Sequence, residues 1–169
     1  MFIPFTSLPK DARIWIYQAD RKLDLSECTI ISRALSALTE SWVVHGAPLR
    51  SSFEVRHGQF IILAADEVSS GVSGCSIDSS VRVVKELGAK LGVDFFARTK
   101  VCFAKGEEIV TLSMNDLKAG FKDGLWDENT LTFDNLIQTK EALDNRWLVA
   151  AGFTWLKRYL PKERQAIMA

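Results

Sequence analysis

The chain has 169 residues, of which 47% are hydrophobic and 25% are charged, and its 21 basic residues balance its 21 acidic ones. This composition fits one globular domain, or a domain with an extension, and excludes a disordered chain. The zero net charge argues against a sequence-independent binder of nucleic acid or of an anionic membrane, because such binders normally carry a basic excess.

The cellular context follows from features that the sequence lacks. No stretch has roughly 18 or more consecutive apolar residues, the length of a membrane span, and residues 1–5 have neither the basic segment nor the cleavage site of a secretory signal. The cysteines, Cys28, Cys75 and Cys102, form no CxxC pair and share no zinc-type spacing with the two histidines. We therefore expect a protein of the reducing cytoplasm, with no metal ion and no cofactor.

The first half of the chain alternates strands and helices. Arg13–Gln18 is rich in β-branched and aromatic residues and is apolar on both faces, which predicts a strand in the middle of a sheet. A capping box in residues 24–27 predicts the start of a helix that ends at His45-Gly46. The alternating pattern of residues 52–57 predicts an edge strand, and the apolar run 60–65 predicts a central one.

The second half opens with a loop rich in glycine and serine, residues 69–76, which leads into a second helix. Residues 99–104 and 107–112 are typical of two strands joined by a tight turn. A short helix follows from residue 113 to about residue 122. The remaining tail contains three of the five tryptophans, namely Trp126, Trp147 and Trp155.

The order strand, helix, strand, strand, helix, strand is that of a ferredoxin-like α+β sandwich. In that fold the first and third strands are central, which agrees with the two segments that are apolar on both faces. Right-handed connections place both helices on one face of the sheet. We predict this core, with an added hairpin strand, over residues 1–112, and a helical, Trp-rich extension packed on it over residues 113–169.

The sheet face away from the helices would carry apolar side chains of the first strand, either Trp15 and Tyr17 or Ile14 and Ile16. Bare exposure of such a surface favours association. Either the Trp-rich tail covers this face or a second copy of the chain does, so a structural role as a homodimer is one of the open alternatives.

The best candidate for chemistry is the stretch 73–79, Ser-Gly-Cys-Ser-Ile-Asp-Ser, at the start of the second helix. Glycine lets a backbone approach a ligand closely, and the free N–H groups of a helix N-terminus bind anions. We predict ligand contacts from Gly74, Ser76, Asp78 and Ser79. The simpler alternative is a turn in which Ser76 or Asp78 caps the helix.

A thiol at the same helix start gains thiolate character, which makes Cys75 a candidate nucleophile. The expected connectivity brings the end of the first helix to the same edge of the sheet, so His45 rather than His57 would be its base. The competing interpretation of His45 is a helix-end residue that interacts with the helix dipole. Cys28 and Cys102 are most simply interpreted as buried small hydrophobic residues.

Residues 60–67 imitate the strand of P-loop ATPases that ends in acidic metal ligands, here Asp66 and Glu67. The sequence contains no G-x-x-x-x-G-K-[ST] segment, so nothing would hold the β- and γ-phosphates of a nucleotide. We therefore predict that the protein is not a P-loop ATPase and that the two acids form a solvated strand end.

A small basic cluster follows Trp155 in the tail. Such a cluster suits RNA or an acidic partner, but the overall neutrality of the chain favours a solvated end with buried tryptophans, and we expect no nucleic acid as a partner. The cluster consists of Lys157, Arg158, Lys162 and Arg164.

Segments spread over nearly the whole chain resemble an uncharacterised family of short bacterial proteins that genome annotation often labels "ABC transporter ATPase". Family membership implies no catalytic residues, because the family has no established activity, and the missing phosphate loop argues against the label itself. The segments that carry the resemblance are Arg13 to Ala19, Trp42 with His45-Gly46, Ser73 to Asp78, Phe133 to Leu136, and Trp147.

We expect a non-enzymatic module that binds a small anion, or an acidic group of a partner, at residues 74–79. One alternative is a thiol-dependent enzyme or redox-sensitive protein with Cys75 as nucleophile and His45 as base. The other is the structural homodimer.

Overall fold

The computed structural model describes the backbone of residues 1–44, 46–66 and 74–167, and their side chains except those of residues 74–76 and 167. The strands are β1 (Arg13–Gln18), β2 (Val43–Val44), β3 (Ala47–Pro48), β4 (Ser51–Arg56), β5 (Phe60–Ala65), β6 (Lys100–Lys105), β7 (Glu108–Ser113), β8 (Leu131–Phe133) and β9 (Leu148–Ala150). The α-helices are α1 (Leu25–Ser41), α2 (Gly74–Leu91), α3 (Leu117–Lys122), α4 (Lys140–Arg146) and α5 (Lys162–Ile167). Short 3-10 helices are η1 (Phe5–Ser7), η2 (Met114–Asp116), η3 (Ala151–Phe153) and η4 (Trp155–Tyr159).

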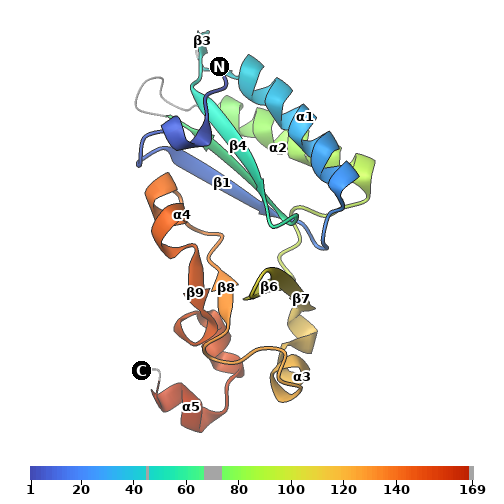
Figure 1. Cartoon of the computed structure of the whole chain (residues 1–169), viewed down its shortest axis with the longest axis vertical. Helices are drawn as coiled ribbons and strands as arrows, with labels where there is room; N and C mark the ends of the chain where they lie inside the picture. Colours follow the sequence, from blue (N-terminus) through green and yellow to red (C-terminus); the bar gives the residue numbers. More distant parts are fainter. Residues whose placement is uncertain (45, 67–73, 168–169) are drawn as a thin grey trace. The chain divides into compact units, whose positions relative to one another are not determined.

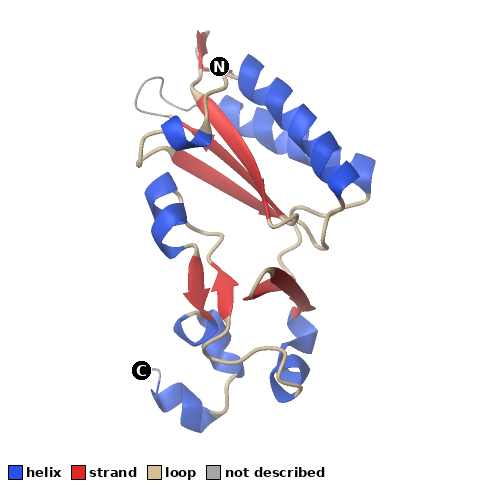
Figure 2. Ribbon diagram, in the orientation of Figure 1, coloured by secondary structure: helices blue, strands red, loops and turns tan. Residues whose placement is uncertain are grey.

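Helices and small antiparallel sheets are both present, which confirms the α+β class (Figure 2). The contacts group the chain into two units. Unit 1 comprises Met1–Ala97 and Asn135–Asp144, and unit 2 comprises Arg98–Asp134 and Asn145–Ala169. Residues 98–112 thus group with the C-terminal part of the chain, whereas the sequence pattern assigns them to the N-terminal core.

The sheet of unit 1 has the order β1-β5-β4, and both of its strand pairs are antiparallel. β5 is central and β4 lies at the edge, as predicted. The prediction that β1 is central is wrong, because β6, the expected fourth strand, pairs with β7 and β8 instead. At the outer edge of β1 the Ile14 N–H donates to the Gln138 carbonyl at 3.0 Å, next to a bridge between Arg13 and Thr139.

Both long helices of unit 1 cover one face of this sheet, as the connectivity rule predicts (Figure 1). Tyr17 and Ile61 of the sheet pack in one buried cluster with Ile31 of α1 and Val84 of α2. The capping box is also confirmed: Asp24 accepts a hydrogen bond from the Glu27 N–H at 2.8 Å, and the Glu27 carboxylate accepts one from the Asp24 N–H at 2.9 Å.

The opposite face of the sheet is covered within the single chain. Most apolar residues on this face are buried: Ile14 of β1 is only 2% exposed, whereas Ile16 is half-buried. Most of the apolar face that motivated the homodimer hypothesis is therefore buried, and the oligomeric state itself stays a prediction. The buried residues are Ile14, Phe60, Ile62 and Ala64.

The first helix ends earlier than predicted. α1 stops at Ser41, and Trp42 already has the extended backbone φ −69°, ψ 118°. The β-branched pair Val43-Val44 then forms β2, which pairs with β3. Gly46, with φ +80°, serves the turn of this hairpin rather than the end of a helix.

The sheet of unit 2 has the order β7-β6-β8-β9 and packs around Trp126. The Trp126 ring stacks on that of Phe103 with centroids 5.3 Å apart, and its indole N–H donates to the Leu117 carbonyl at 2.8 Å. This hydrogen bond satisfies the one polar group of a side chain that is otherwise completely buried. The predicted strands at 99–104 and 107–112 are confirmed as β6 and β7 within one residue at each end.

The tryptophans of the tail are not all buried. Trp126 and Trp147 are buried, but Trp155 is 49% exposed. Two cations of the tail cluster are engaged within the chain: the Arg158 guanidinium lies 4.9 Å from the centre of the Trp155 ring, and Arg164 pairs with Glu128 at 2.8 Å.

Candidate functional site

The predicted anion site lies at the start of α2, which begins at Gly74. Asp78 is exposed and Ser79 is half-buried. The side chains of Cys75 and Ser76, and the whole of His45, lie outside the described residues. The pairing of Cys75 with His45 therefore stays a prediction.

The segments on either side of this predicted pair do share one end of the sheet. Val44, the residue before His45, belongs to the same buried cluster as Ala65, the last residue of β5. Trp42 and Leu49 complete that cluster. The segment that follows α1 and the end of β5, which the sequence predicts as the third strand, thus lie together. The connectivity argument expects this neighbourhood.

Asp66 differs from the expectation of a solvated strand end. It is only 5% exposed, and its carboxylate pairs with Arg50 at 3.3 Å. The backbone of the same two residues is also joined, since the Asp66 N–H donates to the Arg50 carbonyl at 2.9 Å. This acid is a structural partner of Arg50 at the end of the sheet.

The two described cysteines are not poised as nucleophiles. Burial raises the pKa of the Cys102 thiol to about 11, although Thr111 Oγ1, 3.5 Å from its sulfur, acts in the opposite direction. Burial also raises the pKa of Cys28, and the nearby carboxylates of Asp24 and Glu27 add to the shift. Both thiols are therefore protonated near neutral pH, which disfavours nucleophilic attack.

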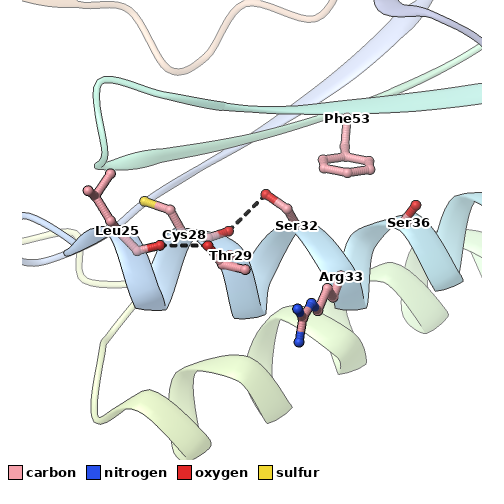
Figure 3. Close-up of a pocket in the computed structure, with 7 residues that line it drawn as sticks. All are labelled: Leu25, Cys28, Thr29, Ser32, Arg33, Ser36 and Phe53. Atoms are coloured by element: carbon pink, nitrogen blue, oxygen red, sulfur yellow. Dashed lines mark hydrogen bonds between the residues drawn. The ribbon is translucent and has the colours of Figure 1, made fainter.

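Cys28 is less buried than predicted, because it lines an open groove between α1 and β4. The groove has a volume of about 680 Å³. Figure 3 shows Phe53 projecting from β4 toward the helix, and Cys28, Ser32 and Ser36 facing it from α1. We call this feature the α1–β4 groove; its lining residues are Leu25, Cys28, Thr29, Ser32, Arg33, Ser36 and Phe53.

The hydroxyl groups in the α1–β4 groove are already engaged. Ser32 Oγ donates to the Cys28 carbonyl at 2.8 Å, and Thr29 Oγ1 donates to the Leu25 carbonyl, also at 2.8 Å (Figure 3). The lining contains no histidine and no carboxylate that could take a proton from them. The lining residues therefore offer these hydroxyl groups no proton acceptor.

The backbone of β4 borders the same groove with unpaired groups. Alternate residues of an antiparallel strand direct their N–H and C=O to the same side. Ser51 directs both away from β5: its N–H donates to the Met1 carbonyl at 3.1 Å, and its carbonyl accepts from the Ile3 N–H at 3.0 Å. Phe53 and Val55 follow the same alternation, and within residues 1–44, 46–66 and 74–167 no backbone partner meets their outward groups.

The chain's own N-terminal segment occupies only the first position of this edge. Phe2 forms a parallel bridge with Ser51. Continued in that register, the Phe53 N–H would donate to the Ile3 carbonyl and the Phe53 carbonyl would accept from the Phe5 N–H. The chain instead turns into η1 at Phe5, whose ring lies 5.6 Å from the guanidinium carbon of Arg56. Within the described residues, the outward groups of Phe53 and Val55 therefore have no backbone partner from the N-terminal segment.

The α1–β4 groove was not predicted from the sequence. A weak signal was present, because Cys28, Ser32 and Ser36 recur every four residues and so place small side chains on one helix face. Leu25, on the first turn, is 88% exposed. The sequence does not reveal that this face of α1 lies beside β4, because that proximity arises from tertiary packing and not from a local sequence pattern.

The part of the chain that the structure describes contains no group of three or more His, Cys, Asp or Glu side chains that could hold a metal ion. Within the same residues, every helix is too short or too polar to cross a lipid bilayer.

No family model, curated protein or solved structure matches the chain. The resemblance to the bacterial family therefore stays a prediction.

Proposed function

We propose that the protein is a non-enzymatic binding module and that its ligand binds in the α1–β4 groove. The observation that carries this proposal is the edge of β4 beside the groove. Phe53, which lines the groove, and Val55, the next outward-facing residue of β4, have no backbone partner for their outward groups within the described residues. Unpaired backbone groups beside an apolar ring and small side chains provide both directional and hydrophobic contacts.

The chemistry of the lining supports binding rather than catalysis. Cys28 has a pKa raised by burial, and the Ser32 and Thr29 hydroxyls donate to carbonyls of their own helix. A catalytic groove needs a nucleophile with a base in reach, or a perturbed acid. Neither is among the lining residues.

A second candidate site, for a small anion, is the start of α2 at residues 74–79. The observation that favours it is the charge of the helix start: α2 has 18 residues, and its first turn contains no acidic residue to offset the positive end of the helix dipole. Titration with inorganic phosphate, followed by the backbone NMR signals of residues 74–79, tests it. Signals that stay unchanged up to millimolar phosphate would contradict it.

The likeness to a ferredoxin-like sandwich belongs to the same proposal. The sheet order β1-β5-β4 with both helices on one face supports it for the first three strands. In such an arrangement β4 is the outer strand, which agrees with its role as the border of the binding site.

The test uses short random peptides displayed on phage and selected on the full chain. Ser32→Trp fills the α1–β4 groove, and Ser41→Trp is the matched control, because Ser41 lies on the same helix but outside the lining. We expect Ser32→Trp to weaken binding of the selected peptides by about tenfold or more, equivalent to about 1.4 kcal/mol, while Ser41→Trp retains wild-type affinity. Recovery only of peptides that bind both variants equally would refute the proposal.

A further inference from the structure

We infer that the ligand of the α1–β4 groove is an extended segment of a partner protein, which adds to β4 as a further strand. This inference rests on the proposed function, since it names the class of ligand that the same groove takes. β4 would recognise the peptide backbone of the ligand, and side-chain contacts would provide selectivity.

The spacing of the open backbone groups fits a strand and not a compact ligand. Phe53 and Val55 each direct one donor and one acceptor outward. Two residues along a strand are about 6.8 Å apart, so the two sets repeat with the period at which an extended peptide presents its own N–H and C=O groups. A small anion does not present hydrogen-bond donors and acceptors in sets about 6.8 Å apart.

The N-terminal segment is an internal example of the same pairing. Residues 1–3 already lie along β4 and exchange two hydrogen bonds with Ser51. The Phe2 ring also packs against the Phe53 ring, with centroids 6.0 Å apart. The edge thus accepts an added strand at one end, and the start of η1 at Phe5 ends that pairing before Phe53 is reached.

The rest of β4 lacks the devices with which sheet edges usually prevent pairing, namely proline, a bulge or a projecting charge. The register with β5 is continuous from Ser51 to Arg56. Glu54 and Arg56 are charged, but they pair with each other at 2.6 Å. By strand alternation they lie on the face opposite Phe53, so neither charge borders the groove.

The two faces beside the edge predict the side-chain pattern of the ligand. A residue of the added strand on the Phe53 side would enter the α1–β4 groove, where Cys28, Ser32 and Ser36 are too small to fill the space. An apolar side chain suits that position. Its neighbours in sequence would point toward the side of Glu54 and Arg56, where polar side chains are expected. The ligand is therefore an extended segment with alternating apolar and polar residues.

The test takes the tightest peptide selected on the full chain and methylates its backbone nitrogens one at a time. Methylation removes a donor without changing a side chain. We expect alternate positions to lose affinity on the order of tenfold, and the other positions to retain it. In the wild-type protein, the amide hydrogens of Phe53 and Val55 should exchange at least about tenfold more slowly when the peptide is bound.

The outcomes separate this inference from the proposed function. If Ser32→Trp abolishes binding but no methylated position matters, the groove binds its ligand through side chains alone, and only the strand-addition inference is overturned. If Ser32→Trp has no effect, the proposed function fails as well. If Phe53 and Val55 become protected as the protein concentration rises without peptide, the occupant is a second copy of the chain, and a partner peptide is excluded.

Discussion

The ring of Phe2 lies 6.0 Å from the ring of Phe53, at an interplanar angle of 53°. This tilted contact joins the N-terminal segment to the edge strand, next to the parallel bridge between Phe2 and Ser51. It places an aromatic side chain at the border between the paired and the open part of β4. The contact therefore contributes to stability and also defines where the open edge begins.

Removal of the Phe2 ring should destabilise the protein modestly. We expect Phe2→Ala to lower the free energy of unfolding by about 1 kcal/mol, because it removes an aromatic pair in which Phe2 is still 43% exposed. Urea unfolding measures the change. Leu136→Ala is the control, since Leu136 is 87% exposed and has little to lose. Equal effects of the two substitutions would contradict a stabilising role of the ring contact.

The carboxylate of Glu27, which caps α1, should make the free energy of unfolding depend on pH in the acidic range. Hydrogen bonds from Arg21, at 2.8 and 2.9 Å, and one from the Asp24 N–H lower the pKa of Glu27 from 4.5 to about 2. A lowered folded-state pKa contributes stability that is complete above pH 4.5 and is lost as the pH falls toward about 2.

We therefore expect Glu27→Gln to flatten the pH dependence of the free energy of unfolding in that window, as measured by urea unfolding at a series of pH values. Arg21→Met should flatten the same window, because it removes the first cause of the shift. A Glu27→Gln protein with the wild-type slope would show that this carboxylate keeps an ordinary pKa.

The pair at the end of β5 should be structural. Asp66 is nearly buried, with 7% of its side chain exposed, and Arg50 lies 3.3 Å from its carboxylate. Arg50→Met removes a cation from beside a nearly buried carboxylate, so we expect a loss of about 1–2 kcal/mol in the free energy of unfolding. The matched control is Arg82→Met, whose pair with Glu86 at 4.0 Å is largely exposed and should cost less than about 0.5 kcal/mol. Indistinguishable losses would argue against a structural role for Asp66.

The cysteines should differ in their reaction with iodoacetamide. Cys102 is 1% exposed and its pKa is raised by burial to about 11, so we expect it to react only after unfolding. Cys28 should react slowly in the folded protein, since burial also raises its pKa. Mass spectrometry of the digested protein locates each modification. Rapid alkylation of Cys102 in the folded state would contradict the packing of β6 against β7.

The same measurement decides on the thiol hypothesis for Cys75. A binding module without thiol chemistry should show a Cys75 alkylation profile with a midpoint near that of a free thiol, about 8.5. A midpoint below about 7 that moves upward in His45→Ala would instead favour a Cys75 nucleophile with His45 as its base.

Local patterns predicted the elements of this fold well, because their causes lie within a few residues. The capping box at Asp24 and Glu27, the extent of β1 and β5, and the edge position of β4 all follow from short-range sequence features. The end of α1 was predicted four residues too late, since Gly46 was assigned to a helix end and not to the turn between β2 and β3.

Strand partners were harder to predict than strands. β6 contains apolar residues such as Val101 and Phe103, which are buried. They would be buried equally well beside β1 or beside β8, and the sequence does not show which of these strands is the partner. The edge of β1 is instead met by Gln138, from a segment far along the chain. The α1–β4 groove was missed for the same reason, because it depends on the distance between elements and not on a motif.

Backbone amide exchange in the free wild-type protein tests the central claim most directly, because the claim is that the edge of β4 is unpaired. We expect the amides of Phe53 and Val55 to exchange much faster than that of Glu54, whose N–H faces β5. Protection of Phe53 and Val55 equal to that of Glu54 would mean that a partner already fills the edge, and the binding site described above would not exist.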